Sequence, residues 1–350
     1  METEVLQKEE TKKQTNRHYR KPKKKSRLKK FLKVLFIIIF ILIFLAATFI
    51  FLFFKTDLFQ YYKELWVQTA MTTMNHQYLA TWFLSEEEIN AIMKSMEVEN
   101  NENSIINAVD TSQFFEDREA KPKENEIKVE RITGSTYVGF VMTVSDCSKV
   151  KMVDARKKNI GTKLSEICKN NNAIAGINAS GFADPEGNGM GNIFNEPVII
   201  DKQLLYGDKV SPMNLIGLSE SGELILGRYT YQEAINVGIK SAIQFGPYII
   251  VNGNNQIKKS NAGGLHPRMA IGQKKDGTMI FVCIDGRQPG YSVGATLLDL
   301  QNIFERYGAY NAANLDGGSS ATMYYDGKVV NKTSTPIGER YLPDAIIVEK

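Results

Sequence analysis

Cysteine and histidine are scarce in this chain: its 350 residues include three of each. Cys147, Cys168 and Cys283 show no CxxC spacing, and no histidine cluster lies near them. The sequence therefore argues against a zinc site. Cys283 lies within an apolar run and is expected to be a buried core thiol. Cys147 and Cys168 either form a disulfide outside the cytoplasm or remain free thiols, and both alternatives stay open.

Acidic residues are absent between Lys12 and Lys33, a stretch that is crowded with lysine and arginine. The net charge of +4 comes from this stretch, because the remainder of the chain carries more acidic than basic residues. A nucleic-acid-binding role would need basic residues on a folded face, with aromatic residues or a known module. The basic stretch instead precedes an apolar segment, so we predict no nucleic-acid partner. We interpret residues 1–33 as a disordered cytoplasmic tail.

Charged residues are also absent from Val34 to Phe54. A helix rises ~1.5 Å per residue, so roughly 20 residues cross a hydrocarbon core of ~30 Å. The run is longer than the apolar region of a secretory signal, about 7–15 residues, and bulky phenylalanines follow Ala46-Ala47. We therefore predict an uncleaved transmembrane helix over residues 34–54 in the cell membrane. The basic N-terminal flank places the N-terminus in the cytoplasm and the C-terminal part outside the cell.

Residues 55–126 are predicted to form a helical stalk and a linker that space the rest of the chain from the membrane. The first part is amphipathic, and Ser85 and Glu88 fit a capping box that opens a helix. The part from Glu97 to Glu126 is rich in Asn, Glu, Asp and Lys, a composition typical of linkers.

From residue 127 onward, short strands and helices alternate irregularly, without an internal repeat. Ile127–Ile132 alternates apolar and polar residues, as a half-buried strand does. The pattern predicts an α+β fold, with a mixed β-sheet and flanking helices in one extracytoplasmic domain (residues 127–350), preceded by a single transmembrane helix. Strands are expected at 127–132, 137–144, 149–153, 173–178, near 198, 215 and 224, at 243–251 with an interruption at Gly246-Pro247, at 269–271 and at 279–284; helices are expected at 164–170, 231–240 and 296–307.

The stretch from Asn311 to Tyr325 concentrates polar groups inside an apolar frame. Asp316 ends an extended segment, Gly317 and Gly318 let a backbone or a ligand approach closely, and Ser319 adds a hydroxyl. Two interpretations follow. Asp-Gly between strands is a hairpin signal, whereas a cluster of polar groups in an apolar frame suits a small-molecule site.

Three further strand ends share this character: Asn178–Gly181, His266–Arg268 and Asp285–Arg287. Each is weak alone, because a strand-end Asn or Asp usually forms a turn and a single Arg is usually a surface group. Together with Asp316 they supply carboxylates, an imidazole and guanidinium groups. This set suits phosphate recognition and proton transfer.

Four motifs in order, His266–Gly272, Val282–Arg287, Ser292–Leu297 and Asn314–Ser320, resemble those of the phosphodiester glycosidase family. The resemblance extends over about residues 173–350 and leaves the tail, the apolar segment and the stalk outside it. Two positions depart from the family pattern, because Ser319 stands where a third glycine is common and Met269 where threonine is common. Neither departure removes a charged group.

The resemblance implies hydrolysis of a sugar-1-phosphodiester, in which the bond between the anomeric carbon and a phosphate oxygen is cleaved. A phosphate monoester is a good leaving group, so cations that stabilise its charge matter more than acid assistance, and two carboxylates are the usual template at the sugar. The implied catalytic residues are Asp316, then Asp285, for carboxylate chemistry, and His266 as a donor to the leaving oxygen. The implied substrate-binding residues are Arg268 as the phosphate clamp, with Arg287 and Arg340 behind it, Asn178 at the sugar hydroxyls, and Gly317, Gly318 and Ser319. For Arg340 we prefer another interpretation of the sequence, in which its side chain forms a salt bridge near the C-terminal strand.

The sequence thus predicts a membrane-anchored hydrolase that acts on cell-surface glycans or glycopolymers containing sugar phosphates, in exopolysaccharide or cell-wall biogenesis. The alternatives are a non-hydrolytic glycan-phosphate binding or assembly protein and a transferase. A calcium ion is a candidate cofactor because Asp and Asn oxygens suit it, although no EF-hand-like spacing supports one.

Overall fold

A computed structural model describes residues 25–73, 76–100, 102–111, 126–185 and 189–350 of the chain. Most of the predicted cytoplasmic tail, residues 1–24, lies outside the described residues. The chain separates into two compact units, residues 1–60 and residues 61–350. We describe each unit by itself.

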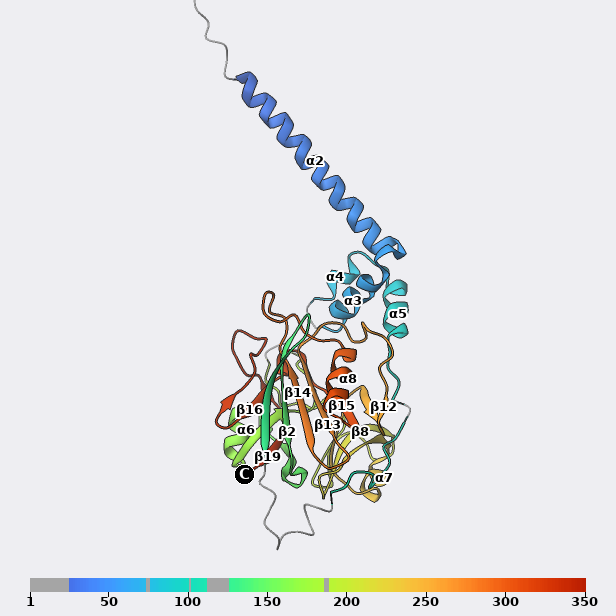
Figure 1. The fold of residues 1–350 in the computed structure, drawn as a ribbon, viewed down its shortest axis with the longest axis vertical. Helices are drawn as coiled ribbons and strands as arrows, with labels where there is room; N and C mark the ends of the chain where they lie inside the picture. The colour runs from blue at the N-terminus through green and yellow to red at the C-terminus, as the bar shows by residue number, and fades with distance from the viewer. Residues whose placement is uncertain (1–24, 74–75, 101, 112–125, 186–188) are drawn as a thin grey trace, which may run out of the picture. The chain divides into compact units, whose positions relative to one another are not determined.

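The first unit contains helix α2 (Lys25–Lys55) and the 3-10 helix η1 (Asp57–Phe59) (Figure 1). The part from Leu28 to Lys55 is long and apolar enough to cross a membrane, and none of its most apolar window is buried. The helix begins before the charge-free run because lysine, arginine and leucine are all good helix formers. It is compatible with a single-pass anchor or with a signal sequence.

The second unit begins with three short helices, α3 (Gln60–Met71), α4 (Tyr78–Thr81) and α5 (Glu86–Ser95). The predicted capping box is confirmed: the hydroxyl of Ser85 accepts from the backbone of Glu88, and the Glu88 carboxylate accepts from the backbone of Ser85. The buried apolar residues of these helices and their connections are Val67, Ala70, Ala80, Leu84, Ile89, Ile92 and Met96. These helices are therefore part of the folded domain.

The segment after α5 lies along the domain surface, although the sequence suggested a spacer there. Ser104 pairs with Leu226, through a backbone bond of 2.7 Å and a side-chain bond of 2.9 Å. The side chains of Asn100 and Asn103 accept from the backbone N–H groups of Tyr248 and Arg228, at 2.9 and 2.8 Å. An asparagine-rich composition is typical of linkers, but here the asparagine side chains accept hydrogen bonds from backbone N–H groups of strands. Residues 112–125 of the predicted linker lie outside the described residues.

Three larger antiparallel sheets and one small sheet form the rest of the domain (Figure 1). The first has the order β1 (Ile127–Thr133), β2 (Val138–Val144), β14 (Met279–Ile284), β13 (Arg268–Gln273), β15 (Asn311–Leu315), β11 (Tyr248–Val251) and β12 (Asn254–Asn255). The second has the order β7 (Gln203–Tyr206), β6 (Val198–Ile200), β10 (Ile239–Gln244), β8 (Met213–Ser219) and β9 (Leu224–Tyr229). The third has the order β17 (Lys328–Val329), β16 (Met323–Tyr325), β5 (Ala173–Asn178), β19 (Asp344–Glu349) and β3 (Val150–Asp154), and β18 (Tyr341–Leu342) pairs with β4 (Thr162–Lys163).

One core joins the three larger sheets, and it includes Met142, Ile177, Ile216 and Ile346. Alternation along the strands decides which side chains reach it. In β13, Met269 and Ile271 face this core, while Ala270 between them packs against the opposite layer.

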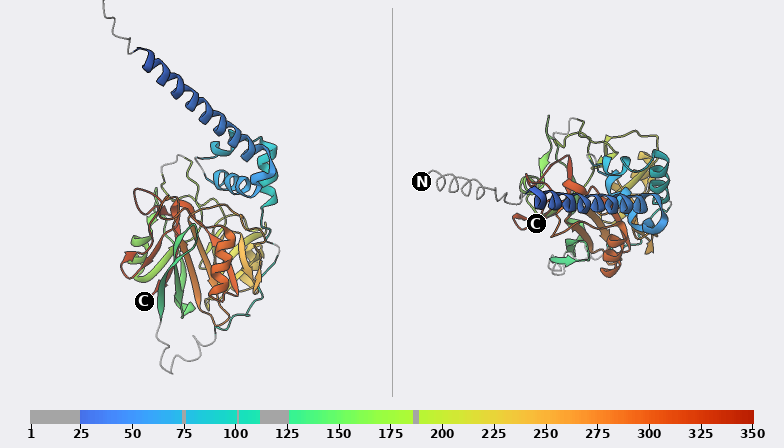
Figure 2. Two further views of the ribbon diagram at one scale, coloured as in Figure 1. Left: turned by 45° about the horizontal axis from the view of Figure 1, so that its top comes forward. Right: turned by 90° about the horizontal axis from the view of Figure 1, so that it is seen from above.

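Helices cover the outer faces of the sheets. Helix α8 (Leu297–Arg306), orange in Figures 1 and 2, packs Leu300 and Phe304 against the outer face of the first sheet. Helix α6 (Leu164–Asn170) packs on the third sheet and α7 (Tyr231–Asn236) on the second. The predicted α+β fold with flanking helices is confirmed, but the strands form several sheets instead of one mixed sheet, and all the strand pairs described are antiparallel.

Two predicted elements end or divide where glycine changes the backbone. The helix expected to reach residue 240 ends at Asn236, because Gly238 has φ of +92° and Ile239 starts strand β10. The strand expected over 243–251 divides at Gly246-Pro247 into β10 and β11, which belong to different sheets.

All three cysteines, Cys147, Cys168 and Cys283, are buried free thiols. The alternative of a disulfide between Cys147 and Cys168 is therefore wrong, whereas the expected burial of Cys283 is confirmed.

Candidate active site

The loop that contains Asp316 crosses from one sheet to another. Strand β15, before it, belongs to the first sheet, whereas β16, after it, pairs with β5 in the third sheet. The hairpin interpretation is therefore wrong. The loop turns through the 3-10 helix η4 (Gly318–Ser320).

Close backbone packing explains the two glycines of this loop. A Cβ atom on Gly317 would lie 2.6 Å from the carbonyl oxygen of Pro267. Gly318 has φ of +57°, and its N–H donates to the same carbonyl at 2.9 Å. Glycine at both positions thus allows the loop to lie directly against the residues that precede β13.

The loop forms one wall of a cleft of about 730 Å³. Two carboxylates, three guanidinium groups and two imidazoles, those of His76 and His266, contribute to its lining. The residues that line it include Thr72, Asp184, Asn195, Phe245, Gly246, Pro247, Gly263, His266, Arg268, Arg287, Leu297, Asn314, Asp316, Gly317, Gly318, Ser319, Ser320 and Arg340.

Asp316 lines the cleft at the end of β15. Burial raises the pKa of its carboxyl to about 6, although a hydrogen bond from Ser320 and the charges of Arg340 and Arg287 lower the pKa. Asp316 is therefore mostly ionised at neutral pH, and a modest fall in pH protonates it. Such a carboxylate can accept a proton or attack an electrophilic carbon.

Asn178 supports this loop and does not line the cleft. Its side chain is fully buried; Nδ2 donates to the carbonyl oxygen of Asp316 at 2.6 Å, and Oδ1 accepts from the N–H of Thr322 at 3.0 Å. Asn178 therefore ties together the two ends of the loop, at residues 316 and 322. Its amide therefore holds the loop, and its predicted contact with sugar hydroxyls stays a prediction.

Arg287 and Arg340 both lie at the turn formed by Gly318 and Ser319. Nη1 of Arg340 donates to the Ser319 hydroxyl at 2.9 Å, and Nη2 forms an ion pair with Asp184 at 3.0 Å. Nη2 of Arg287 lies 3.3 Å from the position that a Cβ on Gly318 would take. Within the described part of the chain, the guanidinium group of Arg287 forms no hydrogen bond or ion pair. It is therefore free to bind an anion in the cleft.

Arg268 reaches the cleft with most of its donors already used. Nε donates to the carbonyl oxygen of Ala295 at 3.1 Å, and Nη2 donates to those of Gly263 and Gly264 at 2.5 and 2.9 Å. Burial, followed by the charge of Arg287, lowers the pKa of Arg268 to about 10, so it stays cationic at neutral pH. Its guanidinium group holds two loops together.

His266 is buried and neutral. Burial lowers the pKa of its imidazole to about 3, with smaller contributions from Arg268 and Arg287. Its Nε2 lies 2.6 Å from the hydroxyl oxygen of Thr72, and this hydroxyl donates to the backbone carbonyl of Gln68 at 2.7 Å. Because a hydroxyl has one proton, Nε2 of His266 is then the donor to Thr72. His266 lines the cleft as a neutral hydrogen-bonding group.

Asp285 is held away from the cleft and does not line it. Its side chain is buried; Oδ2 accepts from the Tyr291 hydroxyl at 2.9 Å, and Oδ1 accepts from Nδ2 of Asn331 and the N–H of Lys332 at 3.2 and 3.0 Å. Burial raises the pKa of this carboxyl, and these hydrogen bonds act in the opposite direction. The predicted site residues therefore do not all meet: Asp316, His266, Arg268, Arg287 and the Gly317–Ser319 turn share the cleft, whereas Asn178 and Asp285 stay outside it.

The residues that follow helix α3 supply a wall that the sequence did not reveal, and the end of the helix binds the loop opposite. Besides the contact between Thr72 and His266, Oε1 of Gln68 accepts from the N–H of Gly263 at 2.7 Å, and the Thr69 hydroxyl accepts from the N–H of Leu265 at 3.0 Å. Nothing in the helical pattern marked these residues, because their partners lie almost 200 positions away in the chain.

Asp184 and Asn314 were also missed. Asp184 pairs with Arg340 and accepts from the N–H of Gly189. Asn314 donates from Nδ2 to the carbonyl of Gly246, while its buried Oδ1 has no hydrogen-bond partner among the described residues. Asn314 stands in the sequence motif with Asp316, so its side chain could have been suspected.

A metal site is not evident among the residues that the structure describes, which contain no cluster of three or more His, Cys, Asp or Glu side chains. The calcium ion suggested by the sequence stays a prediction.

Solved structures that resemble this chain include an enzyme domain with a similar fold. The catalytic domain of zebrafish N-acetylglucosamine-1-phosphodiester alpha-N-acetylglucosaminidase, auto-inhibited by its pro-peptide, is 18% identical with a TM-score of 0.52, over 64% of this chain and 82% of that chain. A putative exported protein from Burkholderia pseudomallei is 14% identical with a TM-score of 0.44, over 61% of this chain and 74% of that chain.

Among curated proteins, the SPbeta prophage-derived uncharacterized protein YomE of Bacillus subtilis is 32% identical over 118 residues, 33% of this chain. The match spans only 18% of the length of that relative. The family model for phosphodiester glycosidases matches residues 171–349, just over half of the chain. The protein therefore belongs to the phosphodiester glycosidase family.

Proposed function

We propose that the protein is a membrane-anchored hydrolase that cleaves sugar-1-phosphodiester bonds in cell-surface glycans or glycopolymers outside the cytoplasm. The observation that carries the proposal is the cleft in which Asp316 lies with Arg287 and Arg340. A carboxylate beside cations matches a substrate that has an electrophilic anomeric carbon next to a phosphate.

In the proposed reaction, water adds to the anomeric carbon and the bond from that carbon to a phosphate oxygen breaks. The products are the free sugar and a phosphate monoester, which takes the electron pair of the broken bond. Arg287 and Arg340 stabilise the charge that develops on the phosphate, and the hydroxyl of Ser319 binds the same group. Because this leaving group needs little proton assistance, the neutral state of His266 is compatible with the reaction.

Asp316 is our candidate for the reacting carboxylate. Asp184 also lines the cleft, but it is already paired with Arg340. Asp316 either attacks the anomeric carbon or removes a proton from the attacking water, and both roles need its ionised form.

The remaining predicted residues take positioning roles in this proposal. Asn178 fixes the peptide of Asp316, Asp285 fixes the segment at residues 331 and 332, and Arg268 fixes the loops at residues 263 and 295. These three side chains shape the cleft without contacting the substrate.

Asp316→Asn tests the proposal, with the full chain in detergent micelles and a panel of methyl phosphodiesters of sugar 1-phosphates. We expect wild-type protein to release free sugar and methyl phosphate from at least one diester. Asp316→Asn removes the charge and keeps the shape, so turnover should fall at least about 100-fold while the diester still binds.

The matched control is Asp326→Asn, an exposed turn residue with φ of +45°, which asparagine also adopts. Its turnover should equal that of wild type. A wild-type protein that binds the diesters but cleaves none would favour the non-hydrolytic binder. Transfer of the sugar to an added alcohol with no release to water would favour the transferase.

A further inference from the structure

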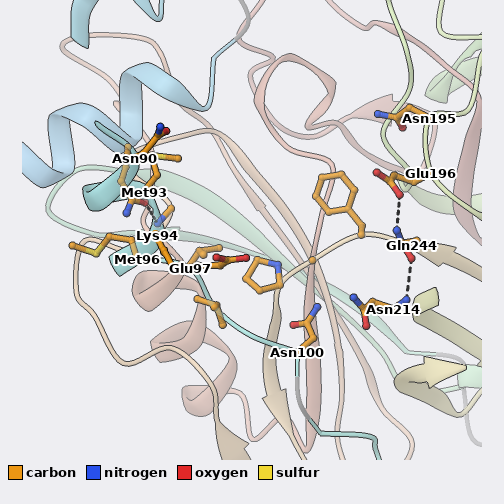
Figure 3. Close-up of a pocket in the computed structure, with 17 residues that line it drawn as sticks. Asn90, Met93, Lys94, Met96, Glu97, Asn100, Asn195, Glu196, Asn214 and Gln244 are labelled. Carbon is orange, nitrogen blue, oxygen red and sulfur yellow. Dashed lines mark hydrogen bonds between the residues drawn. The ribbon is translucent and has the colours of Figure 1, made fainter. Parts of the chain in front are cut away.

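A second, open cavity of about 890 Å³ lies next to the cleft, and Figure 3 draws the residues that line it. This volume lies within the range of roughly 300–1,000 Å³ that ligand pockets have. Asn195, Phe245–Pro247, Gly263 and Leu297 line both spaces, so the cleft and the cavity share a wall. Figure 3 shows Asn90, Met93 and Lys94 of helix α5 on one side of the cavity. On the other side lie Asn195, Glu196, Asn214 and Gln244.

The cavity meets the cleft away from the proposed phosphate subsite. Asp316, Arg287 and Arg340 line the cleft but not the cavity. Neither arginine belongs to the shared wall, so a phosphate bound by them occupies another part of the cleft. In our proposal, the sugar that carries the anomeric carbon takes the part of the cleft between that phosphate and the shared wall.

Amide groups dominate the polar lining of the cavity, and they both donate and accept, as sugar hydroxyls do. Its charged residues are one cation, Lys94, and two acids, Glu97 and Glu196. This balance disfavours a second phosphate. Met93, Phe245 and Pro247 add apolar surface suited to the face of a sugar ring.

Two buried amide atoms at this cavity have no partner in the described part of the chain. Gln68 is only 3% exposed; its Oε1 accepts from the N–H of Gly263, but its Nε2 makes no hydrogen bond. The N–H of Asn214 donates to Gln244, but the Oδ1 of Asn214 has no partner. Buried polar groups normally have partners, so these two atoms lack hydrogen bonds that a hydroxyl group or a water molecule would supply.

We propose that the second cavity binds an uncharged sugar unit attached to the sugar whose anomeric carbon is attacked. The inference rests on the proposed function and extends it: the protein cleaves diesters of oligosaccharides, and so cuts within a polymer as well as at its end. One wall of this subsite comes from helix α5, which lies outside the family match at residues 171–349.

The test compares matched methyl phosphodiesters with the full chain in detergent micelles. One pair joins the methyl phosphate to glucose or to maltose, and the other joins it to N-acetylglucosamine or to chitobiose. In at least one pair, wild type should show a kcat/KM about tenfold higher for the disaccharide than for the monosaccharide, because the added unit gains one or two hydrogen bonds. Met93→Trp fills the cavity and should bring this ratio close to one.

Ala91→Trp is the matched control, because it places the same large side chain on the exposed face of the same helix. It should keep the wild-type ratio. A ratio near one for wild type in both pairs, or a Met93→Trp ratio equal to that of wild type, would overturn the inference.

Saturation-transfer NMR separates this inference from the proposed function. The probes are methyl maltoside and methyl chitobioside, which contain no phosphate. If wild type hydrolyses no diester, the proposed function fails, but binding of one of these disaccharides that Met93→Trp abolishes would still support the subsite. Equal binding to wild type and Met93→Trp, or no binding to either, would then refute it.

Discussion

Asp316 combines a buried carboxyl with two cationic neighbours, and burial dominates, raising its pKa to about 6. The proposed reaction needs the ionised form, so we expect kcat/KM to be constant above that pH. Below about pH 6 it should fall roughly tenfold per pH unit as Asp316 takes up a proton. A pH–rate profile from pH 4 to 8 measures this limb.

Asp344 provides the control for this profile, because burial raises the pKa of its carboxyl to about 7 but it does not line the cleft. Asp344→Asn should therefore keep the acid limb near pH 6. An activity that rises as the pH falls from 7 to 5 would contradict the role given to Asp316, since it would require the protonated carboxyl.

Arg268 and Arg287 should respond differently to the same substitution. Arg268→Lys leaves backbone carbonyls without the donors that they have now, so it should cost at least about 2 kcal/mol of stability with little change in KM. Arg287→Lys loses the planar grip on phosphate, so KM should rise about tenfold while the melting temperature stays unchanged. Thermal melts measure the stability of both variants, and steady-state kinetics measure their KM. An Arg268→Lys protein with wild-type stability and a raised KM would show that Arg268 binds the phosphate, as the sequence predicted.

Residue type alone did not separate groups that face the cleft from groups that hold its loops. Asp316 and Asp285 both follow apolar strands and precede glycine, yet one lines the cleft and the other accepts three hydrogen bonds inside the protein. A carboxylate that binds a substrate and one that binds backbone N–H groups need the same residue. The difference lies in the direction of the side chain, which depends on sheet pairing.

At the level of elements, the sequence predicted most strands and helices because their signals are local. Alternation marked β1, and a capping box marked α5. The pairing of strands was not predictable in the same way. Strands β15 and β16 are close in the chain but belong to different sheets. Strand β16 pairs with β5, which lies over 140 residues earlier in the chain.

Helices α3–α5 make the domain larger than the family match. We expect residues 57–350 to fold as stably as the full chain, and residues 127–350 to melt about 10 °C lower or to aggregate. The missing helices bury several apolar side chains, each worth roughly 1.5–3 kcal/mol, and they satisfy the loop at residues 261–266. Circular dichroism melts of both fragments measure this difference. Equal melting temperatures would show that the helices contribute nothing to stability.

At the scale of the whole molecule, the apolar helix and the basic residues before it define the expected topology. Protease added to intact cells should remove the region after Lys55 and spare the N-terminal tail. A tag at the C-terminus reports removal of the region after Lys55, and a tag at the N-terminus reports protection of the tail. Lysed cells serve as the control, in which the protease removes both tags. A protected C-terminal tag on intact cells would rule out an extracellular catalytic domain.

The charged groups of the cleft come from different sheets. Asp316 and Arg287 follow strands of the first sheet, whereas Arg340 directly precedes β18, and the Asp316 loop spans the boundary to the third sheet. Sliding of one sheet against the other would separate the carboxylate from a guanidinium group before any strand comes apart. Engineering for heat resistance should therefore cross-link the sheets to each other: reinforcing each sheet alone would preserve folded protein that has lost its catalytic alignment.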